Sequence, residues 1–137
     1  MRLMILGLAA LAAACVQNPV YRQSTEPLPV AQIDQHRYLG LWHEQARLPN
    51  SFEDGCQRAT AEYAARDDGL ISVVNTCVDE RGERRIARGR ARPTGTAGEG
   101  KLKVSFFGPF WADYWVLDRG ENYEWSIVGE PEGRYLW

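Results

Sequence analysis

The stretch that decides the fold runs Tyr38-Leu39-Gly40-Leu41-Trp42-His43-Glu44-Gln45-Ala46-Arg47-Leu48-Pro49-Asn50. Gly40 stands two residues before Trp42, and the pair Pro49-Asn50 is a loop signal at the other end. Glycine permits a tight bend and a close backbone approach, while tryptophan brings more apolar area than any other side chain. We therefore expect a strand over residues 40–48 that starts in a bend and buries Trp42 as a plug.

The rest of the chain repeats short strand-like segments between turn signals such as Asp68-Gly69, Arg81-Gly82 and Arg119-Gly120. These segments cover residues 57–66, 70–77, 84–93, 101–107, 113–119, 123–129 and 134–137. Short strands at regular spacing with glycine-rich turns are typical of an antiparallel meander. The sequence predicts an all-β fold, an eight-stranded antiparallel up-and-down barrel over residues 34–137, with a truncated final strand and no C-terminal helix. A barrel of eight strands has room for one small ligand.

Residues 84–92 alternate strictly between small and charged side chains. One face carries Ala87, Gly89 and Ala91, and the other carries Arg84, Ile86, Arg88, Arg90 and Arg92. Neighbouring side chains of a strand point to opposite faces, and burying several unpaired guanidinium groups is prohibitive. The small residues therefore face inward, where they leave space that a packed core would fill with Val, Ile or Leu.

The other inward positions complete the predicted ligand cavity. Ala59, Ala61 and Tyr63 form a second small wall, and Leu102, Val104 and Phe106 form an apolar wall. Glu44 and Ala46 share the face of Trp42 in the first strand. An inward Glu44 fits a general acid, a headgroup contact or a buried pair with an arginine. No second carboxylate or histidine stands at a catalytic spacing from it, so a structural hydrogen bond is favoured.

The N-terminus predicts export and lipidation. Met1-Arg2 is a short basic start, and residues 3–14 form an apolar run too short to span a bilayer, as in a signal peptide. Small residues before Cys15 suit a lipoprotein signal peptidase, although ordinary cleavage beside an incidental cysteine is the alternative. We expect a signal peptide over residues 1–14, a lipidated Cys15, and a tether over residues 15–33. Acyl chains on Cys15 would anchor the protein to a membrane.

Two cysteines remain once Cys15 is lipidated. Cys56 and Cys77 flank the hairpin that turns at Asp68-Gly69, and the midpoint between them falls close to that turn. In an oxidising compartment a disulfide between neighbouring strands is expected. A reactive thiol is the alternative.

Three further runs match the order of motifs along the lipocalins. They are Lys103 to Phe110 (KVSFFGPF), Asp113 to Leu117 (DYWVL) and Tyr135-Leu136-Trp137. Together with residues 38–63 they make the chain similar to the bacterial outer-membrane lipocalin and apolipoprotein D branch of that family.

The resemblance implies structural roles for particular residues. Gly40 and Trp42 would lie at the closed end of the barrel, and Asp113-Tyr114 would match the second family signature, in which the aspartate steadies the closed-end loops. The family arginine that packs on the tryptophan, and the helix that leans on the barrel, would follow the last strand. The printed sequence stops at Trp137, so either the sequence is a fragment or a natural truncation, or the barrel closes imperfectly. An unpaired final edge favours aggregation or pairing with a second copy, a homodimer.

The resemblance also implies a function. Fatty acids and lysophospholipids head the expected ligands, and the expected role is binding, carrying or storing such a lipid for cell-envelope maintenance at the periplasm-facing outer membrane. Two rival classes stay open: a lipocalin-fold enzyme acting on a lipid, and a structural envelope lipoprotein whose barrel is filled by its own side chains. No catalytic residue and no cofactor are assigned.

The net charge and the positions of the two histidines argue against two classes of partner, nucleic acids and metal ions. Without residues 1–14 the chain has 15 basic and 18 acidic residues, a balance that argues against a nucleic-acid partner. The arginine row of residues 81, 84, 85, 88, 90 and 92 is therefore a solvated face or a contact for anionic headgroups. His36 precedes the barrel and His43 faces away from Trp42, so no metal site is expected. The aromatic loop of Phe107, Phe110 and Trp111 either caps an open mouth, touches a membrane, or packs under its hairpin.

Overall fold

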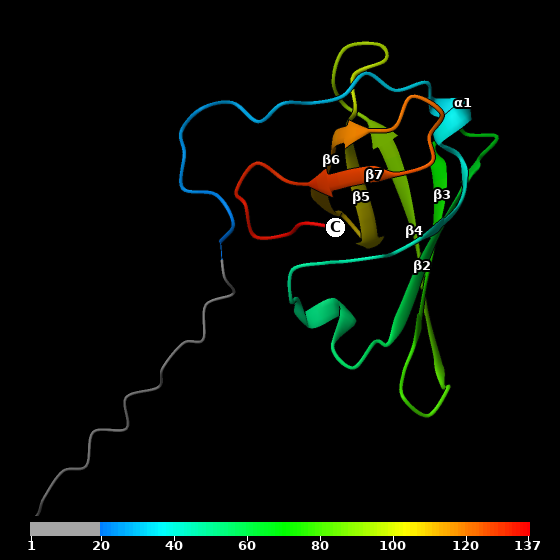
Figure 1. The fold of residues 1–137 in the computed structure, drawn as a ribbon. Helices are drawn as coiled ribbons and strands as arrows, with labels where there is room; N and C mark the ends of the chain where they lie inside the picture. The colour runs from blue at the N-terminus through cyan, green and yellow to red at the C-terminus, as the bar shows by residue number, and fades with distance from the viewer. Residues whose placement is uncertain (1–19) are drawn as a thin grey trace, which may run out of the picture.

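The computed structural model describes residues 20–137, in which seven antiparallel strands curl into a half-barrel (Figure 1). The strands are β1 Gly40–His43, β2 Arg58–Ala65, β3 Ile71–Val78, β4 Arg84–Pro93, β5 Lys101–Phe107, β6 Phe110–Arg119 and β7 Ser126–Gly129. Each strand pairs with the next along the chain, so the sheet order is the sequence order. The predicted all-β meander is confirmed. The predicted signal peptide and Cys15 lie outside the described residues.

The first and last strands differ from the prediction. β1 ends at His43 rather than residue 48, because the chain after Glu44 leaves the sheet and enters the short 3-10 helix η1 (Ser51–Glu53). The expected eighth strand over 134–137 is reduced to a single bridge between Gly129 and Leu136. Two backbone hydrogen bonds between Val128 and Trp137 (2.8 and 2.9 Å) extend that bridge. Among residues 20–137 the sheet therefore has seven strands, not eight.

Gly40 is required by its backbone rather than by crowding. Its φ is +115°, in the region that favours glycine, whereas a Cβ placed there would meet no atom within 4 Å. The expectation of a close backbone approach at Gly40 is therefore wrong, and the expectation of a bend is confirmed. The bend follows α1 (Gln35–Tyr38), whose cap is the Asp34 carboxylate, bonded to the N–H groups of His36 and Arg37.

The part of the predicted tether that the structure describes is bonded to the barrel at its two ends, residues 21 and 31–33. The Tyr21 N–H donates to the carbonyl of Gly133, and the Ala31 N–H donates to that of Val116 (both 2.9 Å). Gln32 forms a β-bridge with Glu99. The segment between these two points has no backbone hydrogen bond to the sheet, and an extended linker stays a prediction for residues 15–20.

Buried residues gather at the end of the half-barrel next to α1, which we call the closed end. The core there consists of Tyr38, Tyr63, Ile71, Val73, Ala91, Leu102 and Val116. The opposite end carries η1, the β3–β4 hairpin and the β5–β6 hairpin, and we call it the mouth (Figure 1). No helix within residues 20–137 is long and apolar enough to cross a membrane.

Candidate functional site

The strand register places the predicted ligand residues on one face of the sheet. One row across β2, β3 and β4 consists of Ala61, Asn75 and Ala87. The next row on the same face, nearer the closed end, consists of Tyr63, Val73 and Gly89. Residues directly opposite in an antiparallel sheet point to the same side. Because Tyr63 and Val73 are buried in the core, this face is the concave one. Ala59, Ala91, Leu102 and Val104 share it through the same ladders, by the pairs Ala59 to Cys77, Ile71 to Ala91, and Ala91 to Val104.

The deep half of the concave face is filled by side chains. Four predicted ligand residues, Tyr63, Ala91, Leu102 and Val104, line an apolar cavity of about 20 Å³ together with residues of α1 and β6. That volume is close to the space of one water molecule and cannot admit an acyl chain. The closed end is therefore a packed floor.

The half nearer the mouth is open. Ala87 faces the concave side and is exposed to solvent, Ala59 and Ala61 are half-buried, and the Phe106 side chain is 40% exposed. Inward-facing residues that water reaches mark an unfilled part of the interior. The small residues predicted to leave space do so here, whereas those at the floor do not.

Gly89 and Phe106 meet across the boundary between these zones. A Cβ on Gly89 would lie 2.7 Å from Cδ1 of Phe106 and 2.6 Å from the backbone oxygen of Ser105. The phenyl ring therefore lies over the glycine, which leaves room for it. A larger side chain at Gly89 would collide with the backbone before it could fill any cavity.

Ala46 is misplaced by the prediction. It is exposed and lies beyond the end of β1, while its neighbour Arg47 turns inward. The Arg47 guanidinium donates to the carbonyl oxygens of Glu53 and Cys56 (3.2 and 3.1 Å) and to Oε1 of Glu44 (2.6 Å). These bonds draw the chain out of the sheet and end the alternation that the sequence suggested.

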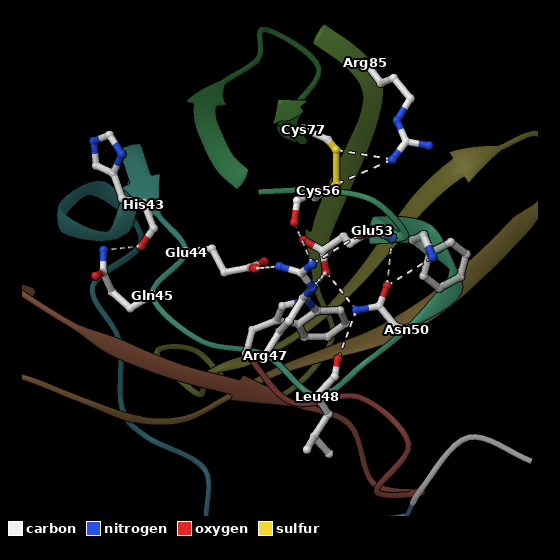
Figure 2. Close-up of polar contacts among 12 residues, drawn as sticks. His43, Glu44, Gln45, Arg47, Leu48, Asn50, Glu53, Cys56, Cys77 and Arg85 are labelled. Atoms are coloured by element: carbon white, nitrogen blue, oxygen red, sulfur yellow. Dashed lines mark hydrogen bonds and ion pairs between the residues drawn. A yellow bond between two sulfur atoms is a disulfide. The ribbon is translucent and has the colours of Figure 1, made fainter. Parts of the chain in front are cut away.

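A cluster of polar side chains joins the mouth to the C-terminal residues (Figure 2). Oε2 of Glu53 lies 3.8 Å from Nε of Arg47. The same oxygen accepts hydrogen bonds from the Asn50 amide and from Nε1 of Trp137 (both 2.8 Å). Burial, with a hydrogen bond to the Glu53 carboxylate, raises the pKa of Glu44 to about 7. Burial alone would raise the pKa of Glu53, but the hydrogen bonds from Glu44, Asn50 and Trp137 outweigh it and lower that pKa. Glu44 is thus held in a buried pair with an arginine, one of the predicted alternatives.

The predicted disulfide is confirmed. Cys56 and Cys77 are bonded, with their Cα atoms 5.4 Å apart, and the bond fastens the η1 loop to β3. Among residues 20–137 no cysteine thiol is therefore free to act as a nucleophile.

The arginine row is not a single face. Cys77 pairs with Arg85, so Arg85 lies on the concave side, unlike Arg84 and Arg88, which are exposed on the other face. Figure 2 shows the Arg85 guanidinium beside the disulfide, with Nη2 3.3 Å from Sγ of Cys77 and 3.6 Å from Sγ of Cys56. Including Arg85 in one solvated row was wrong. Arg85 precedes Ala87, Gly89 and Ala91 at alternate positions, and this spacing could have assigned it to the inward face.

The residues expected to be structural occupy the closed end and the outer face. Nε1 of Trp42 donates to the Tyr38 carbonyl (2.8 Å), and the Tyr114 hydroxyl lies 3.0 Å from that of Tyr38 and 2.9 Å from that of Tyr63. Asp113 pairs with Nζ of Lys103 on the adjacent strand (3.0 Å), so that it links β5 to β6. Trp42, Tyr38 and Tyr114 support the floor of the half-barrel.

The tyrosine network was not found from the sequence. Tyr38 also bonds to the Ser126 hydroxyl (2.9 Å), and burial raises the pKa of Tyr63 and of Tyr114. The three rings lie on α1, β2 and β6, segments whose closeness only the folded chain determines.

The residues of the aromatic loop lie in different surroundings, and the choice between a cap over the mouth and a membrane contact stays a prediction. Trp111 packs on the outer face against arginines of β4, with the guanidinium carbons of Arg92 and Arg90 at 4.4 and 5.2 Å from its ring centre. Phe107 and Phe110 are instead 79% and 74% exposed at the mouth. Within residues 20–137 no group of three or more metal-ligating side chains lies together.

Comparisons with known proteins agree with this geometry. Residues 33–137 match the lipocalin-like domain family. The chain is 48% identical over 112 residues to the outer membrane lipoprotein Blc of Vibrio cholerae, covering 80% of this chain and 65% of that protein, less than two thirds of its length. It is 40% identical over 137 residues to the outer membrane lipoprotein Blc of Escherichia coli K12 (97% and 77% covered). It is 32% identical over 132 residues to apolipoprotein D of Macaca fascicularis (90% and 68% covered). Insecticyanin from the tobacco hornworm Manduca sexta superposes with a TM-score of 0.67 at 25% identity (87% and 67% covered).

Proposed function

The chain belongs to the lipocalin-like domain family, and from that membership we propose that it binds one small hydrophobic or amphipathic lipid on the concave side of its sheet, to carry or store it. The observation that supports the proposal is the solvent-accessible inner face near the mouth, at Ala59, Ala61, Ala87 and Phe106. A barrel filled by its own side chains would bury these residues. The floor at Tyr63 and Ala91 would limit how deep a ligand enters.

The ligand classes we favour are fatty acids and lysophospholipids. About ten methylenes buried at roughly 0.8 kcal/mol each contribute about 8 kcal/mol before the costs of binding, which corresponds to micromolar affinity at best. The open mouth would leave the headgroup in water or against polar side chains. An affinity of that size suits exchange with a membrane.

We place the protein at the outer membrane, lipid-anchored through Cys15 and facing the periplasm, with a role in cell-envelope maintenance. The relatives from Vibrio cholerae and Escherichia coli bear the name outer membrane lipoprotein, which supports this location. Metabolic labelling with an alkyne fatty acid tests the anchor: a Cys15→Ser variant should lose the label, and a labelled variant would refute lipidation at Cys15.

Binding is favoured over catalysis because the cysteine pair that could have supplied a nucleophile is bonded as Cys56–Cys77. The names of the relatives describe lipoproteins and apolipoproteins. A lysophospholipid incubated with pure protein should be recovered intact by mass spectrometry. A deacylated or isomerised product would favour the enzyme class instead.

The deciding experiment is a titration of delipidated protein with a fluorescent fatty acid, read as quenching of tryptophan emission. Saturable quenching with a micromolar midpoint is expected, and mass spectrometry of lipids extracted from native protein would identify the natural ligand. Failure to bind fatty acid or lysophospholipid would support the purely structural lipoprotein. Size-exclusion chromatography with light scattering would test for a homodimer.

A further inference from the structure

We propose that Arg85 and Asn75 form a headgroup site inside the mouth, where Arg85 binds an anionic group and Asn75 accepts a hydrogen bond from a donor next to it. The proposal rests on the proposed lipid binding and adds what part of the ligand the protein recognises. It assigns the ligand to anionic amphiphiles that carry a hydroxyl close to their charge.

Arg85 occupies the concave face at the rim. Arg85 pairs with Cys77 of β3, and Cys77 pairs with Ala59 of β2. The Ala59 carbonyl in turn accepts a hydrogen bond from the N–H of Glu44 (3.0 Å). This row of four residues is the last concave-facing row before the mouth, since the row beyond it (Arg58, Val78 and Arg84) faces outward. The small residues Ala87, Gly89 and Ala91 follow Arg85 at alternate positions toward the floor, so an acyl chain lying along them would bring its headgroup to the guanidinium.

The charge of Arg85 is not neutralised by the protein. Its Nη2 donates to the carbonyl oxygen of Asp54 and approaches the two disulfide sulfurs, which are uncharged partners. No carboxylate of residues 20–137 lies within 4.0 Å of its guanidinium nitrogens, whereas Arg47, an arginine beside η1, is paired with Glu44 and Glu53. The disulfide fastens the loop that supplies the Asp54 carbonyl, so Arg85 is held in place before any ligand arrives.

Asn75 supplies an independent sign of a ligand. Its Oδ1 is buried and has no hydrogen-bond partner within the described chain, and its row neighbours Ala61 and Ala87 have no polar side-chain atoms. A buried acceptor without a donor costs roughly 1–3 kcal/mol. Because Oδ1 is shielded from solvent, a ligand hydroxyl would recover this cost once the amide rotates about its Cβ–Cγ bond and turns Oδ1 toward the cavity. Asn75 lies two residues from Cys77 along β3, so its row is roughly 7 Å deeper than that of Arg85.

Three palmitoyl probes separate the two contacts. Palmitate carries a charge without a hydroxyl, monopalmitoylglycerol carries hydroxyls without a charge, and palmitoyl lysophosphatidic acid carries both. Arg85→Gln should weaken palmitate and lysophosphatidic acid about fivefold, the upper range for an exposed charge pair, and leave monopalmitoylglycerol unchanged. Asn75→Ala should weaken monopalmitoylglycerol and lysophosphatidic acid and leave palmitate unchanged.

Arg88→Gln is the matched control, because Arg88 is an exposed arginine on the opposite face of the same strand. It should leave all three affinities unchanged, and Asn75→Ala should unfold no earlier than the parent chain, since it removes an unpaired buried acceptor. Added salt should weaken palmitate in the parent chain more than in Arg85→Gln.

The pattern of losses decides the outcome. Equal losses for all three probes in Arg85→Gln, or the same loss in Arg88→Gln, would overturn the headgroup site while leaving lipid binding intact. A parent chain that binds none of the three probes would instead refute the proposed function itself. sn-Glycerol 3-phosphate alone should not bind at comparable concentration; if it does, the site recognises a free phosphate rather than a lipid headgroup.

Discussion

The backbone N–H of Leu48 donates a 2.9 Å hydrogen bond to the carbonyl oxygen of Leu136, and this bond joins the two ends of the sheet. Leu136 is itself bridged to Gly129 of β7, while residue 48 follows β1 along the chain. The half-barrel is thus tied across its gap beside the mouth by this bond, and the hydrogen bond from Nε1 of Trp137 to Glu53 is a second tie there. Within residues 20–137, the contacts of Leu136 and Trp137 make this closure in place of a full strand ladder.

Trp137 should contribute to this closure through its indole N–H. Trp137→Phe keeps the stacking on Tyr135 but removes the donor to Glu53, and a hydrogen bond to a charged group contributes about 1.5–3 kcal/mol. We expect the free energy of unfolding, measured in urea, to fall by about 2 kcal/mol. Trp125→Phe, at a residue 44% exposed, should change it little; an equal loss there would remove the special role of Trp137.

The pKa of Glu44 predicts a pH dependence of stability. Its pKa rises from 4.5 to about 7 on folding, so the folded state binds the proton more tightly than the unfolded chain. The stabilisation is complete below pH 4.5 and is lost as the pH rises toward 7. Urea unfolding across this range should show a decline that Glu44→Gln flattens, whereas Glu62→Gln, at an exposed position, keeps it. A slope unchanged in Glu44→Gln would contradict the assignment.

The Tyr114 hydroxyl should stabilise the floor. Tyr114→Phe leaves the hydroxyls of Tyr38 and Tyr63 without their shared partner in a buried site, and we expect a loss of about 1–3 kcal/mol by thermal or urea unfolding. Tyr135→Phe is the control, because Tyr135 lies outside this network at the mouth. A neutral Tyr114→Phe would mean that water replaces the missing hydroxyl.

Filling the open half of the concave face should abolish lipid binding without unfolding the protein. Ala87→Phe adds a ring on the solvent-accessible inner face, and Ala64→Phe adds the same ring on the outer face of β2, where Ala64 is also exposed. The fluorescent fatty acid titration should lose its signal for Ala87→Phe alone. Normal binding by Ala87→Phe would place the ligand elsewhere.

Removing the disulfide should cost stability through the unfolded chain. The bond closes a loop across a sequence separation of 21, for which the chain-entropy estimate is about 3 kcal/mol. The double variant Cys56→Ser and Cys77→Ser should unfold at correspondingly lower urea. It should also bind palmitate more weakly, since the Asp54 carbonyl that holds Arg85 loses its anchor; an unchanged affinity would separate the disulfide from the headgroup site.

Much of the fold follows from local pattern. The bend at Gly40, the turn glycines and the alternation of residues 84–92 fix where strands run and which face is small, because a strand must alternate and a charged face must be solvated. The same local rules predicted the disulfide, although Cys56 lies in the loop before β2 rather than on a strand. They failed after His43, where Arg47 bonds to carbonyl groups of a later loop and draws the chain out of the sheet.

By itself the sequence determined an all-β meander, a disulfide and an inner wall of undersized residues, since these depend on side-chain period and short-range spacing. Only the tertiary structure decided that the interior is packed at Tyr63, Ala91 and Tyr114 and open at Ala87, and that Arg85 belongs to the inner face beside the disulfide. How far the interior is filled depends on which side chains of α1, β2 and β6 contact one another. Those contacts depend on the twist and register of the whole sheet, which cannot be determined from a short stretch of sequence.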